Sequence, residues 1–242
     1  MMIQNKTAGI FVIGDEILSG RTEDLNSPFL IKELNGKGVE VKYCFTLPDD
    51  PNTIAHFAMN YSEDVSWVFT SGGIGPTPDD VTMVAFSLAF NVPLVSHTIL
   101  ARQIKKYYQE KCTPEHMKMA MVPEGTSLIQ NAKTDLHALH FKNIYFLPGV
   151  PDFFTKVFLG IQDEFIGDLK PNREIDLVTD EGWITGSLEQ TLALFPEIKI
   201  GSYPSFSKGT QKVKIVLEHK DEGYLDKAFN SLYEKVDAFV IK

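Results

Sequence analysis

The 242-residue chain has an ordinary globular composition, 43% hydrophobic and 23% charged, and is long enough for one large domain or a medium domain with a small second one. Its net charge of −9 argues against nucleic acid as the main partner, because phosphate backbones are bound through Lys and Arg. No apolar run reaches the roughly 20 residues of a membrane-spanning helix, so no membrane partner is expected. The polar N-terminus does not resemble a signal peptide, and two cysteines are too few for a disulfide framework, which favours a cytoplasmic setting.

Short apolar runs alternate with segments of helical periodicity in the first two thirds of the chain. Strands are predicted at residues 8–13, 39–46, 67–70, 138–141 and 144–147. Helices are predicted to begin at Ser27-Pro28, Asp50-Pro51, Thr77-Pro78 and Thr113-Pro114, with others through residues 100–107 and 154–165. This alternation predicts an α/β fold: a three-layer, mostly parallel sheet with helices on both faces.

A polar, proline-containing segment at residues 167–173 is expected to be a linker between a domain at 1–168 and a smaller one at 169–242. The smaller domain has a different order of elements. Strands are predicted at 176–179, 198–203, 213–218 and 238–241. One helix is predicted to begin at Ser187, and another to run through residues 225–236. The order β-α-β-β-α-β predicts a small ferredoxin-like α+β unit.

The segment after the third strand carries the clearest chemical signal, Ser71-Gly72-Gly73-Ile74-Gly75-Pro76-Thr77-Pro78-Asp79-Asp80. Ligands of open parallel sheets bind at the carboxyl ends of strands, and glycines there let backbone N–H groups approach an anion. The helix expected from Thr77 adds its positive end. Asp79 and Asp80, in its first turn, would repel a phosphate unless a divalent cation such as Mg²⁺ lies between them.

A simpler interpretation stays open, because Asp in a first helical turn often only satisfies the helix end, and glycines can form a plain turn. The same two possibilities hold for a second cluster after the first strand, where Asp15 and Glu16 either contribute to the site or cap a tight turn. Three further positions are equally open between a site and a local turn or cap: Asn26, Asp49 and Pro148-Gly149.

His137 and His140 lie on a predicted strand, and neither is expected to be catalytic. A lone histidine usually has a structural role or faces solvent.

Several motifs occur together and in order, and they carry a family resemblance. They are residues 14–20 (Gly-Asp-Glu-Ile-Leu-Ser-Gly), Asn26, residues 70–80, residues 122–125 (Val-Pro-Glu-Gly) and residues 147–151 (Leu-Pro-Gly-Val-Pro). Over residues 6–168 the chain resembles the molybdopterin-binding (MoCF biosynthesis) family, in the branch of the CinA N-terminal domain and the molybdopterin-binding-like domain of FAD synthase. Residues 201–204 extend the resemblance into the small unit.

The resemblance implies metal-dependent hydrolysis of a nucleotide pyrophosphate of the ADP-ribose or FAD type. Because the chain ends at Lys242, a stand-alone version is expected, and the family suggests a homo-oligomer, either dimer or trimer. On this hypothesis Asp79 and Asp80 are catalytic and hold Mg²⁺ or Co²⁺. The nucleotide would contact Ser71, Gly72, Gly73, Gly75, Thr77, Asp15, Glu16, Asn26, Pro148 and Gly149.

The resemblance leaves two alternatives open, a molybdopterin-binding protein of molybdenum-cofactor biosynthesis and a non-enzymatic nucleotide- or pterin-binding module. The chain also departs from the family at one place. The family usually has Pro-Gly before the strand that leads to Pro148-Gly149, whereas residues 134–139 here place His137-Ala138 there. We expect this change near the pocket to alter substrate choice or activity.

Overall fold

The computed structural model describes residues 6–130, 136–207 and 209–241. The chain divides into two compact units, Met1–Leu169 and Lys170–Lys242. Residues 165–171, around the division, have no regular secondary structure. In the described part of the chain no helix is both long and apolar enough to cross a bilayer.

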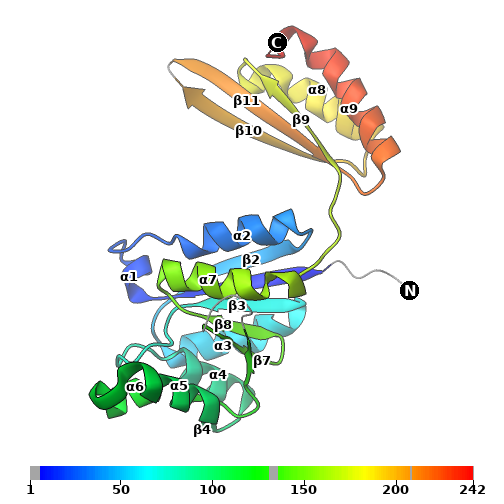
Figure 1. Ribbon diagram of the computed structural model, residues 1–242. Coiled ribbons are helices and arrows are strands. Elements are labelled where there is room, and N and C mark those ends of the chain that lie inside the picture. Colours follow the sequence, from blue (N-terminus) through cyan, green and yellow to red (C-terminus); the bar gives the residue numbers. More distant parts are fainter. Residues whose placement is uncertain (1–5, 131–135, 208, 242) are drawn as a thin grey trace. The chain divides into compact units, whose positions relative to one another are not determined.

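The described residues of the first unit form a six-stranded sheet in the order β2-β1-β3-β8-β7-β6 (Figure 1). Its strands are β1 (Thr7–Ile13), β2 (Glu40–Leu47), β3 (Trp67–Ser71), β6 (Ser127–Ile129), β7 (Ala138–Phe141) and β8 (Ile144–Leu147). The first three and β8 are mutually parallel, and β7 and β6 add an antiparallel edge. β1 lies inside the sheet and is buried along its whole length, which explains its unbroken apolar sequence.

Helices cover both faces of this sheet (Figure 1). They are α2 (Asn26–Gly36) and α7 (Pro151–Ile161) on one face, and α3 (Pro51–Tyr61) and α4 (Thr82–Phe90) on the other. On the first face, Leu30 and Leu34 pack with Phe154 and Phe158 against the sheet. On the second, the buried side chains of α3 and α4 enclose Phe11 and Phe146. The predicted three-layer, mostly parallel α/β fold is confirmed.

A smaller excursion of the chain separates α4 from the antiparallel edge. It contains β4 (Leu94–Ser96), α5 (Thr98–Tyr108), α6 (Pro114–Lys118) and β5 (Met121–Pro123), and β4 pairs with β5. The remaining short elements of the unit are α1 (Asp15–Leu18), η1 (Ser62–Asp64), η2 (Gln109–Lys111) and η3 (Gln162–Glu164). The three-residue strands β4, β5 and β6 were not predicted, since they are too short to show a periodic pattern.

The second unit is a three-stranded antiparallel sheet with two helices packed on it. Its elements are β9 (Asn172–Leu177), α8 (Glu181–Leu194), β10 (Lys199–Ser207), β11 (Thr210–Glu218), α9 (Glu222–Val236) and η4 (Asp237–Phe239). Alternate residues of β9 and β11 meet the buried face of α9 in one core. The strand expected at residues 238–241 is wrong: η4 turns the chain there, and only Val240 forms a bridge, to Leu177.

Candidate functional site

The glycine loop after β3 is folded tightly against the end of β1. Gly72 has φ +100, and a Cβ there would collide with the carbonyl oxygen of Ile13. Thr82, at the start of α4, anchors the loop from the other side: its hydroxyl donates to the Gly72 oxygen at 2.9 Å and its N–H to the Gly73 oxygen at 3.0 Å. Only glycine satisfies both the positive φ and the close approach at position 72.

Asp80 closes this loop through its own carboxylate. Oδ1 accepts the N–H of Gly75 at 2.7 Å, and Oδ2 accepts the N–H of Thr77 at 2.7 Å and the Thr77 hydroxyl at 2.5 Å. The placement of Asp79 and Asp80 in a first helical turn is wrong, because α4 begins at Thr82. An Asp side chain that satisfies nearby backbone N–H groups stabilises a turn in competition with a helix.

These internal bonds determine which N–H groups of the loop can meet a ligand. The N–H of Gly72 donates to the oxygen of Leu147 at 3.2 Å, and that of Gly75 donates to Asp80. Among the described residues, the N–H groups of Gly73 and Ile74 have no acceptor. An anion at this loop would therefore be met by Gly73 and Ile74 rather than by the whole run from Gly72 to Gly75.

Asn26 lies beneath the loop and joins three segments. Its amide donates to the Ser71 hydroxyl at 2.8 Å and to the Gly149 oxygen at 2.7 Å. Asn26 and Ser71 are buried, and neither lines the pocket. These hydrogen bonds connect the ends of β3 and β8 through Asn26. The ligand contacts predicted for Asn26 and Ser71 stay predictions. Gly149 does reach the pocket, and a Cβ there would lie 3.2 Å from the Gly72 Cα.

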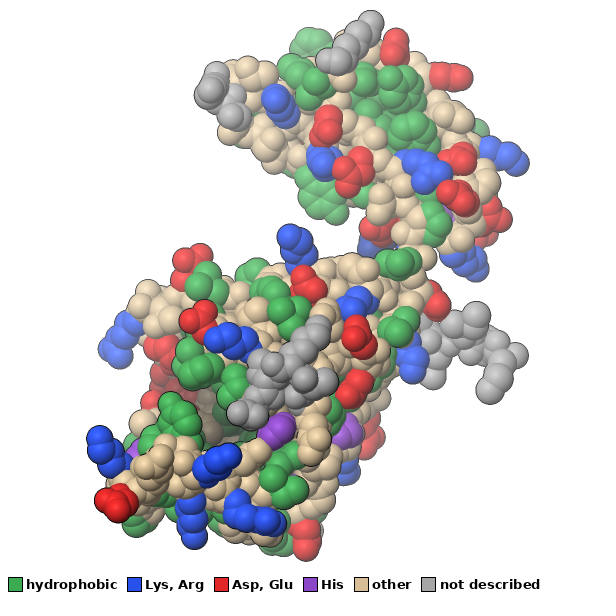
Figure 2. Space-filling view, viewed as in Figure 1, with side chains coloured by type: hydrophobic (Ala, Val, Ile, Leu, Met, Phe, Trp, Pro, Cys, Tyr) green, Lys and Arg blue, Asp and Glu red, His purple; other side chains and the backbone are tan. Residues whose placement is uncertain are grey.

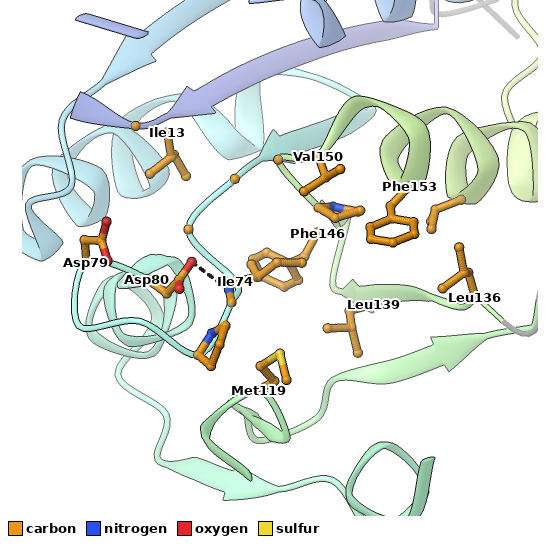
Figure 3. Close-up of a pocket in the computed structure, with 18 of the residues that line it drawn as sticks. Ile13, Ile74, Asp79, Asp80, Met119, Leu136, Leu139, Phe146, Val150 and Phe153 are labelled. Atoms are coloured by element: carbon orange, nitrogen blue, oxygen red, sulfur yellow. Dashed lines mark hydrogen bonds between the residues drawn. The ribbon is translucent and has the colours of Figure 1, made fainter. Parts of the chain in front are cut away.

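A pocket of about 800 Å³ opens over the glycine loop. Figure 3 shows Asp79 and Asp80 on one side of it and Leu136, Leu139 and Phe153 on the other. The acidic side also includes Glu16 and Asp49, from the segments that follow β1 and β2. The carboxyl ends of three neighbouring strands thus supply one wall, as expected for an open parallel sheet. Two further predicted contacts, Asp15 and Thr77, do not line the pocket.

The carboxylates of the acidic wall influence one another. Asp15 donates its N–H to Asp49 Oδ2 at 2.9 Å, and Asp49 donates its own to Asp15 Oδ1 at 3.4 Å. Burial raises the pKa of Asp49; the Asp15 N–H opposes this, and the charges of Asp15, Glu16 and Asp79 raise it further. The pKa of Asp79 is lowered by hydrogen bonding from the Thr77 side chain and from the backbone N–H of Asp79 itself. The Thr77 hydroxyl lies closest to Asp80, whose Oδ2 accepts its hydrogen bond at 2.5 Å.

This arrangement bears on the expected metal ion. No group of three or more His, Cys, Asp or Glu side chains in the described chain is arranged to hold a metal ion. Mg²⁺ is often bound by one or two carboxylates together with substrate phosphates, so a ready-made cage is not required. The repulsion that raises the pKa of Asp49 is the kind that a bound cation relieves. A cation at this wall would therefore need phosphate oxygens as ligands in addition to the carboxylates of the chain.

The opposite side of the pocket is an apolar bay that the sequence did not predict. We use this name for the lining side chains Leu100, Ile104, Tyr108, Met119, Leu136, Leu139, Phe146 and Phe153. Leu100 and Ile104 show the helical spacing expected of a core stripe, and periodicity does not distinguish a stripe that faces a core from one that faces a pocket. His137 also lines this region.

Charged side chains of both signs are interspersed on the face of the molecule shown in Figure 2. Several Lys and Arg side chains lie over the lower part of the first unit in this view.

Comparison with known proteins agrees with the fold. A family model described as "Probable molybdopterin binding domain" matches residues 9–166, and one described as "FAD synthase, middle domain" matches residues 172–242. The chain is 28% identical to a "Probable FAD synthase" of Caenorhabditis elegans, over 99% of this chain and 52% of that protein. It is 30% identical to a protein of Archaeoglobus fulgidus, over 90% of this chain and 98% of that one.

Among solved structures, the protein CinA from Thermoplasma acidophilum, described as of unknown function, is similar with a TM-score of 0.62 and 31% identity. The similarity covers 67% of this chain and 99% of that one. The chain spans about half the length of the curated FAD synthases that it matches in Caenorhabditis elegans and Caenorhabditis briggsae.

Proposed function

Because the chain belongs to the molybdopterin-binding domain family, and its relatives include CinA-like proteins and FAD synthases, we propose that it hydrolyses the pyrophosphate of a nucleotide of the ADP-ribose or FAD type with a divalent metal ion. One observation carries the proposal. The free N–H groups of Gly73 and Ile74 lie on a loop that lines a pocket with an acidic wall on one side and the apolar bay on the other. This arrangement suits a cation at the acidic wall, a phosphate at the loop and a heteroaromatic ring in the apolar bay.

Each part of the pocket has a role in this proposal. The N–H groups of Gly73 and Ile74 bind and orient one phosphate. Glu16 and Asp79 would hold Mg²⁺ or Co²⁺, which when bound would offset charge on the phosphates and make a water molecule easier to deprotonate. Asp49 uses Oδ2 to accept the Asp15 N–H, which leaves Oδ1 to take a proton from the attacking water. The raised pKa of Asp49 makes it a stronger base than an ordinary Asp.

In this proposal Asp80 has a different role from the one expected from the sequence. Its two oxygens accept three hydrogen bonds from the loop, so it positions Gly75 and Thr77 rather than serving as the main ligand of a metal ion. Asp79 accepts neither of the backbone N–H groups that Asp80 accepts, and it is exposed at the pocket. In this proposal Asp79 therefore binds the cation and Asp80 maintains the geometry of the loop.

The test is phosphorus-31 NMR of the protein with ADP-ribose, FAD, NAD and ATP, each with Mg²⁺, with Co²⁺ and with EDTA. Metal-dependent conversion of one of the pyrophosphates to monophosphates is expected. Asp79→Asn should lower that rate by at least about 100-fold, within the range for loss of a group that acts in the transition state. Glu23→Gln is the matched control, because Glu23 is exposed and does not line the pocket. No conversion with any substrate rejects the proposal.

The apolar bay and the family description favour a second candidate, binding of molybdopterin for molybdenum-cofactor biosynthesis. Protein purified with a fluorescent pterin, and without pyrophosphatase activity, would support it. Binding of a nucleotide or a pterin without turnover would instead identify a non-enzymatic module.

A further inference from the structure

His137 is a polar side chain on an otherwise mainly apolar side of the pocket. It lies at the start of the β7 segment, between the bay residues Leu136 and Leu139. Its Nδ1 is buried and has no hydrogen-bond partner among the described residues. Buried polar atoms in folded proteins are nearly always paired, so an unpaired one calls for an explanation.

A purely structural role does not explain this histidine. His140, three residues further along, packs its ring against Tyr145 with a centroid separation of 4.6 Å. His137 makes no such ring contact and no side-chain hydrogen bond within the described residues. Within the described residues the His137 ring therefore has no polar partner, although it lines a pocket large enough for a nucleotide.

The burial of Nδ1 indicates which ring nitrogen carries the proton. A proton on Nδ1 would be a buried donor without an acceptor, whereas a bare Nδ1 leaves only an unused lone pair. The tautomer protonated at Nε2 avoids that buried donor. His137 is half-buried and lines the pocket, so the edge of the ring that carries Nε2 is the one available to a ligand.

We propose that His137 is a specificity-determining residue, whose Nε2–H donates a hydrogen bond to an acceptor on the edge of a planar heteroaromatic ring held in the apolar bay. The ligand class is a phosphate ester or anhydride whose ring carries a carbonyl oxygen or an unprotonated ring nitrogen, as flavins and purines do. This inference deepens the proposed function and rests on it only in assuming that the same pocket holds the ligand. It needs no hydrolysis.

The test uses FMN and AMP, which carry a ring and one phosphate but no pyrophosphate bond, and inorganic phosphate, which has no ring. Dissociation constants are measured by calorimetry for the unmodified protein, His137→Leu, His137→Gln and the control His140→Gln. The unmodified protein should bind FMN or AMP more tightly than phosphate. His137→Leu should raise the dissociation constant of that ring-bearing ligand about 5- to 10-fold and leave the dissociation constant of phosphate within about twofold. His137→Gln keeps a donor near the Nε2 position and should stay within about threefold.

Equal weakening of phosphate and nucleotide, or no weakening of either, overturns the inference, as does failure of both FMN and AMP to bind. If His137→Leu does not fold, long-range ¹H–¹⁵N NMR of the unmodified protein decides the question. The His137 ring should be protonated at Nε2 and its Nε2 resonance should move on addition of the ligand; a proton on Nδ1 contradicts the inference. Ligand binding through His137 without any hydrolysis would reject the pyrophosphatase proposal alone.

Discussion

Replacement of Asp80 by Ala separates loop geometry from metal binding. The change removes the acceptor for the N–H groups of Gly75 and Thr77 and for the Thr77 hydroxyl. Asp80 is half-buried, so we assign about 1 kcal/mol to each of the two backbone bonds, below the usual range for a charged acceptor, and about 2 kcal/mol in total. For a unit of this size, Met1–Leu169, that corresponds to a fall in Tm of about 4–8 °C.

Asp80→Asn keeps one oxygen acceptor, and its Tm should fall by about half as much. Asp79→Asn should lower Tm less than Asp80→Ala, because the exposed Asp79 carboxylate accepts neither of the backbone N–H groups, of Gly75 and Thr77, that Asp80 accepts. It should nevertheless lose most of the metal-dependent turnover. The assays are differential scanning calorimetry without metal and calorimetric titration of Mg²⁺ in the presence of AMP. Asp80→Asn should still bind Mg²⁺ within about threefold of the unmodified protein.

The reasoning is refuted by either of two results. A Tm for Asp80→Ala within about 1 °C of the unmodified protein would show that the hydrogen bonds of the carboxylate do not stabilise the loop. Loss of Mg²⁺ binding in Asp80→Asn at an unchanged Tm would restore the direct role in metal binding that the sequence suggested.

Three further predictions concern the frame around the site. Gly38→Ala should lower the free energy of unfolding by more than about 2 kcal/mol, because Gly38 has φ +75 and a Cβ there would collide with neighbouring backbone. Gly36 has open space around it, so the control Gly36→Ala should be neutral or stabilising. Urea unfolding measures both. Thr82→Val should cost about 1–2 kcal/mol by leaving the Gly72 oxygen buried without its hydroxyl donor, and an unchanged unfolding midpoint would contradict this. Asp49→Asn should raise Tm at pH 7 without metal, because the raised pKa of Asp49 means that its charged form destabilises the fold above that pKa. The gain in Tm should shrink as the pH falls through the pKa of Asp49. A gain that grows on acidification would contradict this prediction.

Much of the frame could be predicted from local patterns. Unbroken apolar runs predicted the buried parallel strands, and Ala138–Phe141 and Ile144–Leu147 were predicted with their observed bounds. Pro at the first turn marked the start of α3, where Asp50 accepts the N–H of Thr53 at 2.7 Å. These signals are local, so they do not depend on the rest of the fold.

The same local signal failed at Thr77-Pro78, because its outcome depended on a side chain. Asp80 bonds back to Gly75 and Thr77, which keeps that stretch in turns and moves the helix start to Thr82. The sequence identified the glycine loop, but it did not reveal that the Gly72 N–H is already used by Leu147. Such pairings join strands that are far apart in the sequence, and spacing alone does not predict them.

The apolar bay illustrates a different limit. Its members come from α5, from the segments around α6 and β7, from β8 and from the start of α7. Nothing in the sequence marks them as neighbours. Their apolar character fits a core equally well. Only the fold brings them beside the acidic wall.

The two sides of the pocket differ in how they can change. The loop that meets the phosphate is held by main-chain bonds, by Asp80 and Thr82, and by glycines that no other residue replaces. The bay consists of interchangeable apolar side chains, and cores tolerate such exchanges when volume is kept. Substitutions in the bay can therefore retune which ring is accepted while the phosphate position stays fixed. On this scaffold, ligand preference can diversify between relatives, or be redesigned in the laboratory, without rebuilding the loop.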